Sequence, residues 1–149
     1  MNVDYFMKEA IIEAKKAIKN YEIPVGGVLV DNRSNEIISR SYNKVNKYNN
    51  PIKHCELNLI SQACKLIQSK YLNNYTLFVT LEPCTMCASA ISEAHITNLY
   101  FGAYDEKNGG IEKIRVAFKK NNLFMPHIYG GIKEAECSKL IRDFLKSQR

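Results

Sequence analysis

Two cysteines three residues apart follow a proline in the segment EPCTMC, at residues 82–87. Such a pair can be a redox-active dithiol, part of a structural zinc site, or part of a catalytic zinc site. A thioredoxin-like dithiol usually has its proline between or well after the cysteines, which disfavours the first interpretation. A structural site needs four protein ligands, and Cys55, Cys64 and Cys137 each lack a partner at short spacing. The second interpretation is therefore weak.

A catalytic zinc site needs three protein ligands and keeps its fourth position for water. Cys84 and Cys87 are one turn apart, so at the start of a helix both sulfurs face one side, and the helix dipole favours their thiolates. His54 is the candidate third ligand. Glu56 could act on the water, but residues two apart in a helix point to nearly opposite faces. The two can share a pocket only if His54 precedes the regular helix, a boundary that Pro51 supports.

The order HCE at 54–56 and PCTMC at 83–87 resembles the signature of the zinc-dependent nucleoside and nucleobase deaminases. Within that superfamily the chain most resembles the bacterial tRNA-specific adenosine deaminases. The similarity extends through EIPVGGVLV, SYN at 41–43, LFVTLEPCTMCASAI, LYFGAYD and YGGI. It implies hydrolytic deamination of adenosine to inosine at the wobble position of a tRNA anticodon. It also implies one Zn²⁺ per subunit and a homodimer that binds the anticodon stem-loop across both subunits.

The same resemblance implies a set of catalytic and substrate-binding residues. Glu56 would be the catalytic acid and base, and His54, Cys84 and Cys87 the metal ligands. Asn43 matches a residue that hydrogen-bonds the flipped base, Asp105 matches one that lies beside the nucleotide backbone, and backbone at Val28 would line the pocket. Alternatively, Asn43 could cap a turn and Asp105 a loop or helix. Cys55 stands where the family usually has alanine, and we expect it to point away from the metal.

The elements needed to position these residues alternate along the chain. Patterns of apolar residues predict helices over 3–20, up to about 69, and over 85–94, 111–120 and 133–146, with strands over 25–31, 37–43, 76–82, 96–104 and 126–131. This order predicts one domain over 1–149, a three-layer α/β/α fold that the resemblance identifies as cytidine-deaminase-like. We expect a mixed sheet of about five strands with helices on both faces. The LEPC segment follows the strand over 76–82, where ligands of such sheets bind.

Composition and charge agree with a globular domain and weakly favour an anionic partner. Of 149 residues, 46% are apolar and 24% charged, and 21 basic against 15 acidic residues give a net charge of +6. On the final helix, one arc carries the candidate RNA backbone contacts, which could equally be a solvated surface: Lys139, Arg142, Lys146 and Arg149. We find no apolar stretch long enough for a membrane and no signal peptide, so we expect a cytoplasmic protein.

Two rival functions stay open at this point. A small-molecule deaminase of the same superfamily, acting on guanine or on a cytosine nucleoside or nucleotide, would use identical zinc chemistry. A non-catalytic RNA-binding module would use zinc only to brace its fold. Glu56 distinguishes the second rival, because a bracing site has no use for a carboxylate that does not bind the metal. The sequence does not indicate which tRNA is the substrate.

Overall fold

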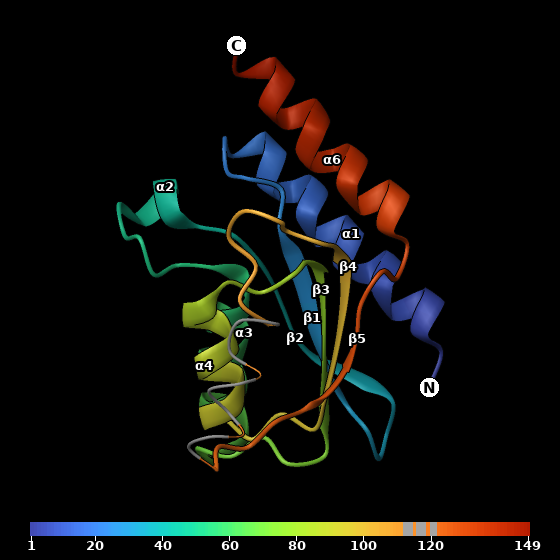
Figure 1. Ribbon diagram of the computed structural model, residues 1–149. Helices are drawn as coiled ribbons and strands as arrows, with labels where there is room; N and C mark the ends of the chain where they lie inside the picture. The colour runs from blue at the N-terminus through green and yellow to red at the C-terminus, as the bar shows by residue number, and fades with distance from the viewer. Residues whose placement is uncertain (112–114, 116–118, 120–121) are drawn as a thin grey trace.

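The computed structural model describes residues 1–111, 115, 119 and 122–149 (Figure 1). Its helices are α1 Val3–Lys19, α2 Val45–Tyr48, α3 Cys55–Ile67, α4 Thr85–Glu93 and α6 Glu134–Ser147. Its strands are β1 Gly26–Asp31, β2 Glu36–Tyr42, β3 Tyr75–Leu81, β4 Asn98–Ala103 and β5 His127–Tyr129. The helix expected over 111–120 falls largely outside the described residues. The other expected elements are present within a few residues of their predicted bounds.

The strands in the described part of the chain form one mixed sheet in the order β2-β1-β3-β4-β5. β1 is antiparallel to β2 and β3, whereas β3, β4 and β5 run parallel. The carboxyl ends of β2, β3 and β4 therefore meet at one edge of the sheet. Helices α1 and α6 cover one face and α3 and α4 cover the other, as Figure 1 shows. The predicted three-layer fold is confirmed.

Two adjacent glycines allow α1 and α3 to pack closely on opposite faces of β1. A Cβ on Gly26 would lie 2.1 Å from the backbone nitrogen of Ala14 in α1. A Cβ on Gly27 would lie 2.9 Å from the side chain of Leu59 in α3. Any larger residue would push a helix away from the sheet, since real Cβ atoms do not approach so closely. These contacts set how near the start of α3 comes to the sheet.

The segment between β2 and α3 contains the one element that the sequence analysis did not predict. The polar residues around 46–51 predicted no element, but Val45–Tyr48 form the single turn of α2. Four residues are too few to show a helical period, and this turn buries none of its side chains. None of the described helices is long and apolar enough to cross a membrane.

Candidate active site

Three side chains that could bind a metal ion meet where the starts of α3 and α4 face each other. His54 is the N-cap residue of α3 and has extended backbone angles, φ −68° and ψ 151°. Cys84 is the N-cap residue of α4, and Cys87 lies in its first turn. His54 Nδ1 lies 3.7 Å from Cys84 Sγ and 3.6 Å from Cys87 Sγ. The prediction that His54 precedes the regular helix is confirmed.

The spacing of these atoms fits a tetrahedral zinc ion. Bond lengths of about 2.0–2.1 Å to nitrogen and about 2.3 Å to sulfur place two tetrahedral ligands roughly 3.6 Å apart. The candidate ligand atoms of His54, Cys84 and Cys87 all lie within 4.8 Å of one another. Among the described residues, no further His, Cys, Asp or Glu joins this group. Three protein ligands leave one coordination position for water, as in catalytic zinc sites.

The three side chains share protons in a way that prepares them to bind a cation. Hydrogen bonds from Cys87 and His54 lower the pKa of Cys84 to about 4. The hydrogen bond with Cys84, together with burial, raises the pKa of Cys87, and the pKa of His54 is raised by its own hydrogen bond with Cys84. Negative charge therefore resides on Cys84. Metal binding replaces shared protons of this kind.

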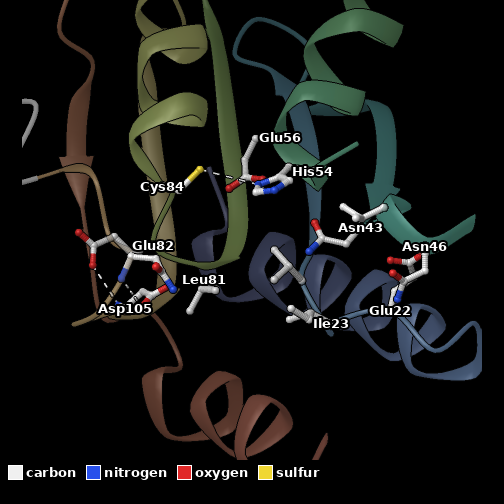
Figure 2. Close-up of a pocket in the computed structure, with 13 residues that line it drawn as sticks. Glu22, Ile23, Asn43, Asn46, His54, Glu56, Leu81, Glu82, Cys84 and Asp105 are labelled. Carbon is white, nitrogen blue, oxygen red and sulfur yellow. Dashed lines mark hydrogen bonds between the residues drawn. The ribbon is translucent and has the colours of Figure 1, made fainter. Parts of the chain in front are cut away.

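Glu56 lies beside the cluster without belonging to it. It occupies the first turn of α3 and is buried, with 4% of its surface exposed. Figure 2 shows its carboxylate pointing toward the space between His54 and Cys84. Burial raises the pKa of Glu56 to about 6. A carboxyl group next to the ligands but not among them is placed to transfer protons.

A cavity of about 390 Å³ opens onto the cluster (Figure 2). Pockets of this size hold small ligands such as a nucleoside. Its lining combines apolar walls with a few polar groups: Glu22, Ile23, Val25, Asn43, Val45, Asn46, His54, Glu56, Leu81, Glu82, Cys84, Asp105 and Asn108. The apolar walls suit the faces of a flat base, and the polar groups can read its edge.

Asn43 lines this cavity and also fixes the start of α3. Its Oδ1 accepts a hydrogen bond of 2.8 Å from the backbone N–H of Cys55, the first residue of the helix. With Oδ1 engaged in this way, the side-chain NH₂ group is the donor that Asn43 can offer to a ligand. Asn43 is 92% buried, so its side chain has little freedom to turn. Asn43 can therefore cap the start of α3 with its oxygen and still donate a hydrogen bond to a base with its NH₂ group.

Cys55, which stands between a candidate ligand and Glu56, is directed away from the cluster. Its thiol is fully buried and donates a hydrogen bond to the backbone carbonyl of Ser41, with 3.3 Å between sulfur and oxygen. Burial raises the pKa of this thiol, so it stays protonated. Cys55 therefore packs α3 against β2.

Asp105 lies at the cavity rim and caps its own loop. Its carboxylate accepts hydrogen bonds from the backbone N–H groups of Lys107 and Asn108, at 3.2 and 2.9 Å. The backbone N–H of Asp105 donates to Glu82 Oε2 at 3.0 Å. Gly109 packs on that carboxylate so closely that an added Cβ would lie 2.4 Å from Glu82 Oε2. The sequence analysis missed Glu82, which joins this rim to the segment carrying Cys84.

The expectation that backbone at Val28 lines the pocket is wrong. Val28 is fully buried in the core on the α1 side and is absent from the cavity lining. Ile23 and Val25 line the cavity instead, because the chain enters β1 beside the metal cluster and has left it by Val28. The apolar run that begins before the strand already contained Ile23 and Val25, and could have indicated them as pocket residues.

The four basic residues on α6 and just after it lie at different places relative to the cavity. Arg142 lines a second depression, of about 540 Å³, which shares Ile23, Leu81, Asp105 and Asn108 with the first. Lys139 forms an ion pair with Asp143 on the same helix. Lys146 and Arg149 are exposed and line neither depression. The structure therefore brings only Arg142 of this set close to the cavity.

Comparison with known proteins agrees with this geometry. Residues 1–103 match the family model described as the cytidine and deoxycytidylate deaminase zinc-binding region. The chain is 41% identical over 144 residues to the tRNA-specific adenosine deaminase of Rickettsia bellii (strain RML369-C), covering 96% of this chain and 99% of that protein. The aligned region therefore includes all of the segments that build the site.

Two solved structures are similar in different ways. The first, from work on A-to-I editing by tRNA:A34 deaminases at the wobble position of transfer RNA, has a TM-score of 0.86 and 39% identity, covering 91% of this chain and 98% of that one. The second, the guanine deaminase from Nitrosomonas europaea, has a TM-score of 0.80 but 17% identity, covering 95% and 84%. The second likeness concerns the fold alone.

Proposed function

The chain belongs to the cytidine and deoxycytidylate deaminase family, and we propose that it deaminates adenosine to inosine at the wobble position, position 34, of a tRNA anticodon. One observation carries the proposal: three metal ligands and a buried carboxylate that is not a ligand meet at a nucleoside-sized cavity. The extent of identity to a tRNA-specific adenosine deaminase supports the choice of substrate. Guanine deaminases are less similar and give weaker support to a free base: the Nitrosomonas europaea protein is 17% identical, and the Bacillus subtilis protein is 32% identical but covers only 70% of this chain.

His54, Cys84 and Cys87 would hold one zinc ion per subunit, which supplies a water molecule whose pKa is lowered to near 7. The Glu56 carboxylate accepts a proton from the attacking water and delivers it to the ring nitrogen beside C6 of adenine. The same carboxylate then takes the proton of the hydroxyl group that has formed on C6 and passes it to the amino group. The C–N bond breaks, ammonia leaves, and C6 becomes a carbonyl. One residue can serve both steps because burial holds its carboxylate beside the candidate metal ligands, where the reacting atoms would lie.

The cavity walls would hold the base in place for this reaction. Asn43 offers its NH₂ group to an acceptor on the base, while its oxygen stays bonded to α3. Ile23 and Leu81 provide apolar surface for the ring. The target base must leave its stack to enter, which costs least in a single-stranded loop. An anticodon loop meets this requirement, and Asp105 and Arg142 lie where the adjoining backbone would leave the cavity.

We also propose that the protein acts as a homodimer. Large apolar side chains are exposed on α3, on α4 and on the segments that follow them, and a second copy could cover them: Leu66, Tyr71, Met86, Leu123, Phe124 and Met125. Exposed apolar surface of this kind favours association. Light scattering of the purified protein tests this arrangement, with twice the mass of one chain as the expected result.

Incubation with an anticodon stem-loop RNA that carries adenosine at position 34 tests the proposed activity. We expect inosine at that position, detected by sequencing, and release of ammonia. The matched control is Glu56→Gln, which keeps the shape of the side chain and, we expect, the bound zinc, but cannot shuttle protons. In parallel reactions the RNA is replaced by the free bases adenine, guanine and cytosine or by their nucleosides. Rapid turnover of a free base or nucleoside without any change in the RNA would contradict the proposal.

A further inference from the structure

The end of β2 and the segment that joins it to α3 carry two tyrosines and three lysines next to the cavity. We call this group the lysine–tyrosine rim: Tyr42, Lys44, Lys47, Tyr48 and Lys53. We propose that the rim binds the RNA strand adjoining the target adenosine, with its lysines on phosphates and Tyr48 against a base. This proposal rests on the proposed function and assigns RNA contacts to a surface separate from α6.

The rim has the composition of a surface for single-stranded RNA. Lys44 Nζ lies 5.1 Å from the ring centre of Tyr42. Lys47 Nζ and Lys53 Nζ lie 5.5 and 5.9 Å from the ring centre of Tyr48. Tyr48 is 54% exposed, so about half of its surface is open to solvent. Aromatic rings flanked by cations bind unpaired strands by stacking and by charge together.

The lysine side chains of the rim form no ion pair within the described part of the chain. Residues 42–53 include three lysines and no acidic residue. Lys139 of α6, by contrast, is paired with Asp143. Lysines that are not held in ion pairs release counterions when they meet phosphates, which favours binding.

The rim lies on the path that a strand would follow out of the cavity. Val45 and Asn46, from the middle of the same segment, line the cavity itself. Lys44, Tyr48 and Lys53 line a separate depression of about 340 Å³ between this segment and α3. In Figure 1 this segment, with α2, projects from the body of the domain. A nucleotide next to the target adenosine would therefore meet the rim directly.

Hydrogen bonds to the rest of the domain hold the rim in a fixed shape. The backbone N–H of Lys44 donates to the carbonyl of Lys53 at 2.9 Å. The buried carboxylate of Glu22 accepts from the backbone N–H of Lys47 at 2.7 Å. The side chain of Asn46 donates to the carbonyl of Tyr21 at 2.8 Å. A surface ordered before binding loses little conformational freedom when RNA arrives.

The salt dependence of RNA binding tests the role of the lysines. The probe is a fluorescent anticodon stem-loop with adenosine at position 34, bound by the zinc-loaded Glu56→Gln protein so that no turnover occurs. Each phosphate contact on a single strand adds about 0.7 to the slope of log affinity against log salt. Replacement of Lys44, Lys47 and Lys53 by glutamine should lower that slope by about 2 and weaken binding at least roughly tenfold near physiological salt.

The matched control removes three exposed lysines of α1, Lys8, Lys15 and Lys19, which line neither depression and lie outside the proposed dimer surface. We expect the control to keep the slope within about 0.5 of the unsubstituted protein. Equal effects of the two triple variants would overturn the proposal.

Tyr48→Leu tests stacking separately from charge, and we expect roughly tenfold weaker binding with an unchanged salt slope. If the lysine variants change the mass in solution but leave the slope unchanged, the rim contacts a second copy of the chain and the proposal fails. Deamination of the stem-loop by the unsubstituted protein is measured in a separate assay from RNA binding. A slope change without inosine would refute the proposed function alone, and inosine without a slope change would refute the rim alone.

Discussion

Removal of the Glu82 carboxylate is expected to loosen the cavity rim without touching the metal ligands. Glu82 Oε2 accepts the backbone N–H of Asp105 at 3.0 Å, and the Glu82 side chain is 8% exposed. Glu82→Ala would leave that N–H without its acceptor, which costs about 1–3 kcal/mol. For a chain of this size, 2 kcal/mol corresponds to a fall in Tm of roughly 4–8 °C.

The functional effect should appear in KM and not in zinc content. Glu82 anchors Asp105, and the Asp105 carboxylate in turn orders Asn108 at the cavity rim. We expect Glu82→Ala to raise KM for the stem-loop roughly tenfold while kcat stays within about twofold, since the reacting groups are not disturbed. Zinc analysis should give the unsubstituted value, because Cys84 is held by α4 as well.

Two further variants make this test decisive. Glu82→Gln keeps an acceptor oxygen in the same place and should recover most of the Tm and KM. Glu106→Ala removes an exposed acid from the same loop and should match the unsubstituted protein. Thermal denaturation followed by circular dichroism and steady-state kinetics supply the numbers. The reasoning is refuted if Glu82→Ala behaves like Glu106→Ala, or if it loses zinc and kcat while KM is unchanged.

Three other changes separate the roles assigned around the cluster. Cys55→Ala should keep bound zinc while lowering the free energy of unfolding by about 1–2 kcal/mol, measured in urea, because it removes a buried thiol and its hydrogen bond; loss of zinc would make Cys55 a ligand. Asn43→Ala should lose about 1–2 kcal/mol of stability with the α3 cap, whereas Asn43→Asp keeps the acceptor and should lose roughly 10- to 100-fold in kcat/KM with far less effect on Tm. Removal of the metal with a chelator should lower Tm and added zinc should restore it; the same shift in Cys84→Ala would show that the chelator acts elsewhere.

The order of the helices and strands could be predicted from the sequence, and so could the positions of His54, Glu56 and Cys84, because both depend on local patterns. The strand over 76–82 followed by a helix placed Cys84 at the carboxyl end of β3, and the described structure has it there. The two-residue spacing of His54 and Glu56 forced His54 outside the helix, which its extended backbone angles confirm. The geometry of a helix decides whether two residues this close in sequence can face one pocket, and within one turn that geometry does not depend on the rest of the fold.

The cavity walls were not predictable in the same way, because they depend on contacts between distant segments. Val25 and Val28 belong to one apolar run, and only the path of the chain past α3 decides which of them reaches the cavity. Likewise, Glu82 and Asp105 meet because β3 and β4 pair in parallel, so that their carboxyl ends lie side by side. No periodic pattern in the sequence indicates that two distant residues will come into contact.

Burial separates the candidate metal centre from the lysine–tyrosine rim. His54 and Cys84 cap helices whose apolar residues lie in the core beneath the sheet, so their positions follow from packing. Residues 44–53 bury no side chain fully, and substitutions there cost little stability. A guanine deaminase at 17% identity shares this fold, so the same layers can carry different loops at the sheet edge. If the proposed roles hold, we expect the lysine–tyrosine rim and residues 104–108 after β4 to distinguish an RNA substrate from a free base, with the proposed proton transfer by Glu56 unchanged.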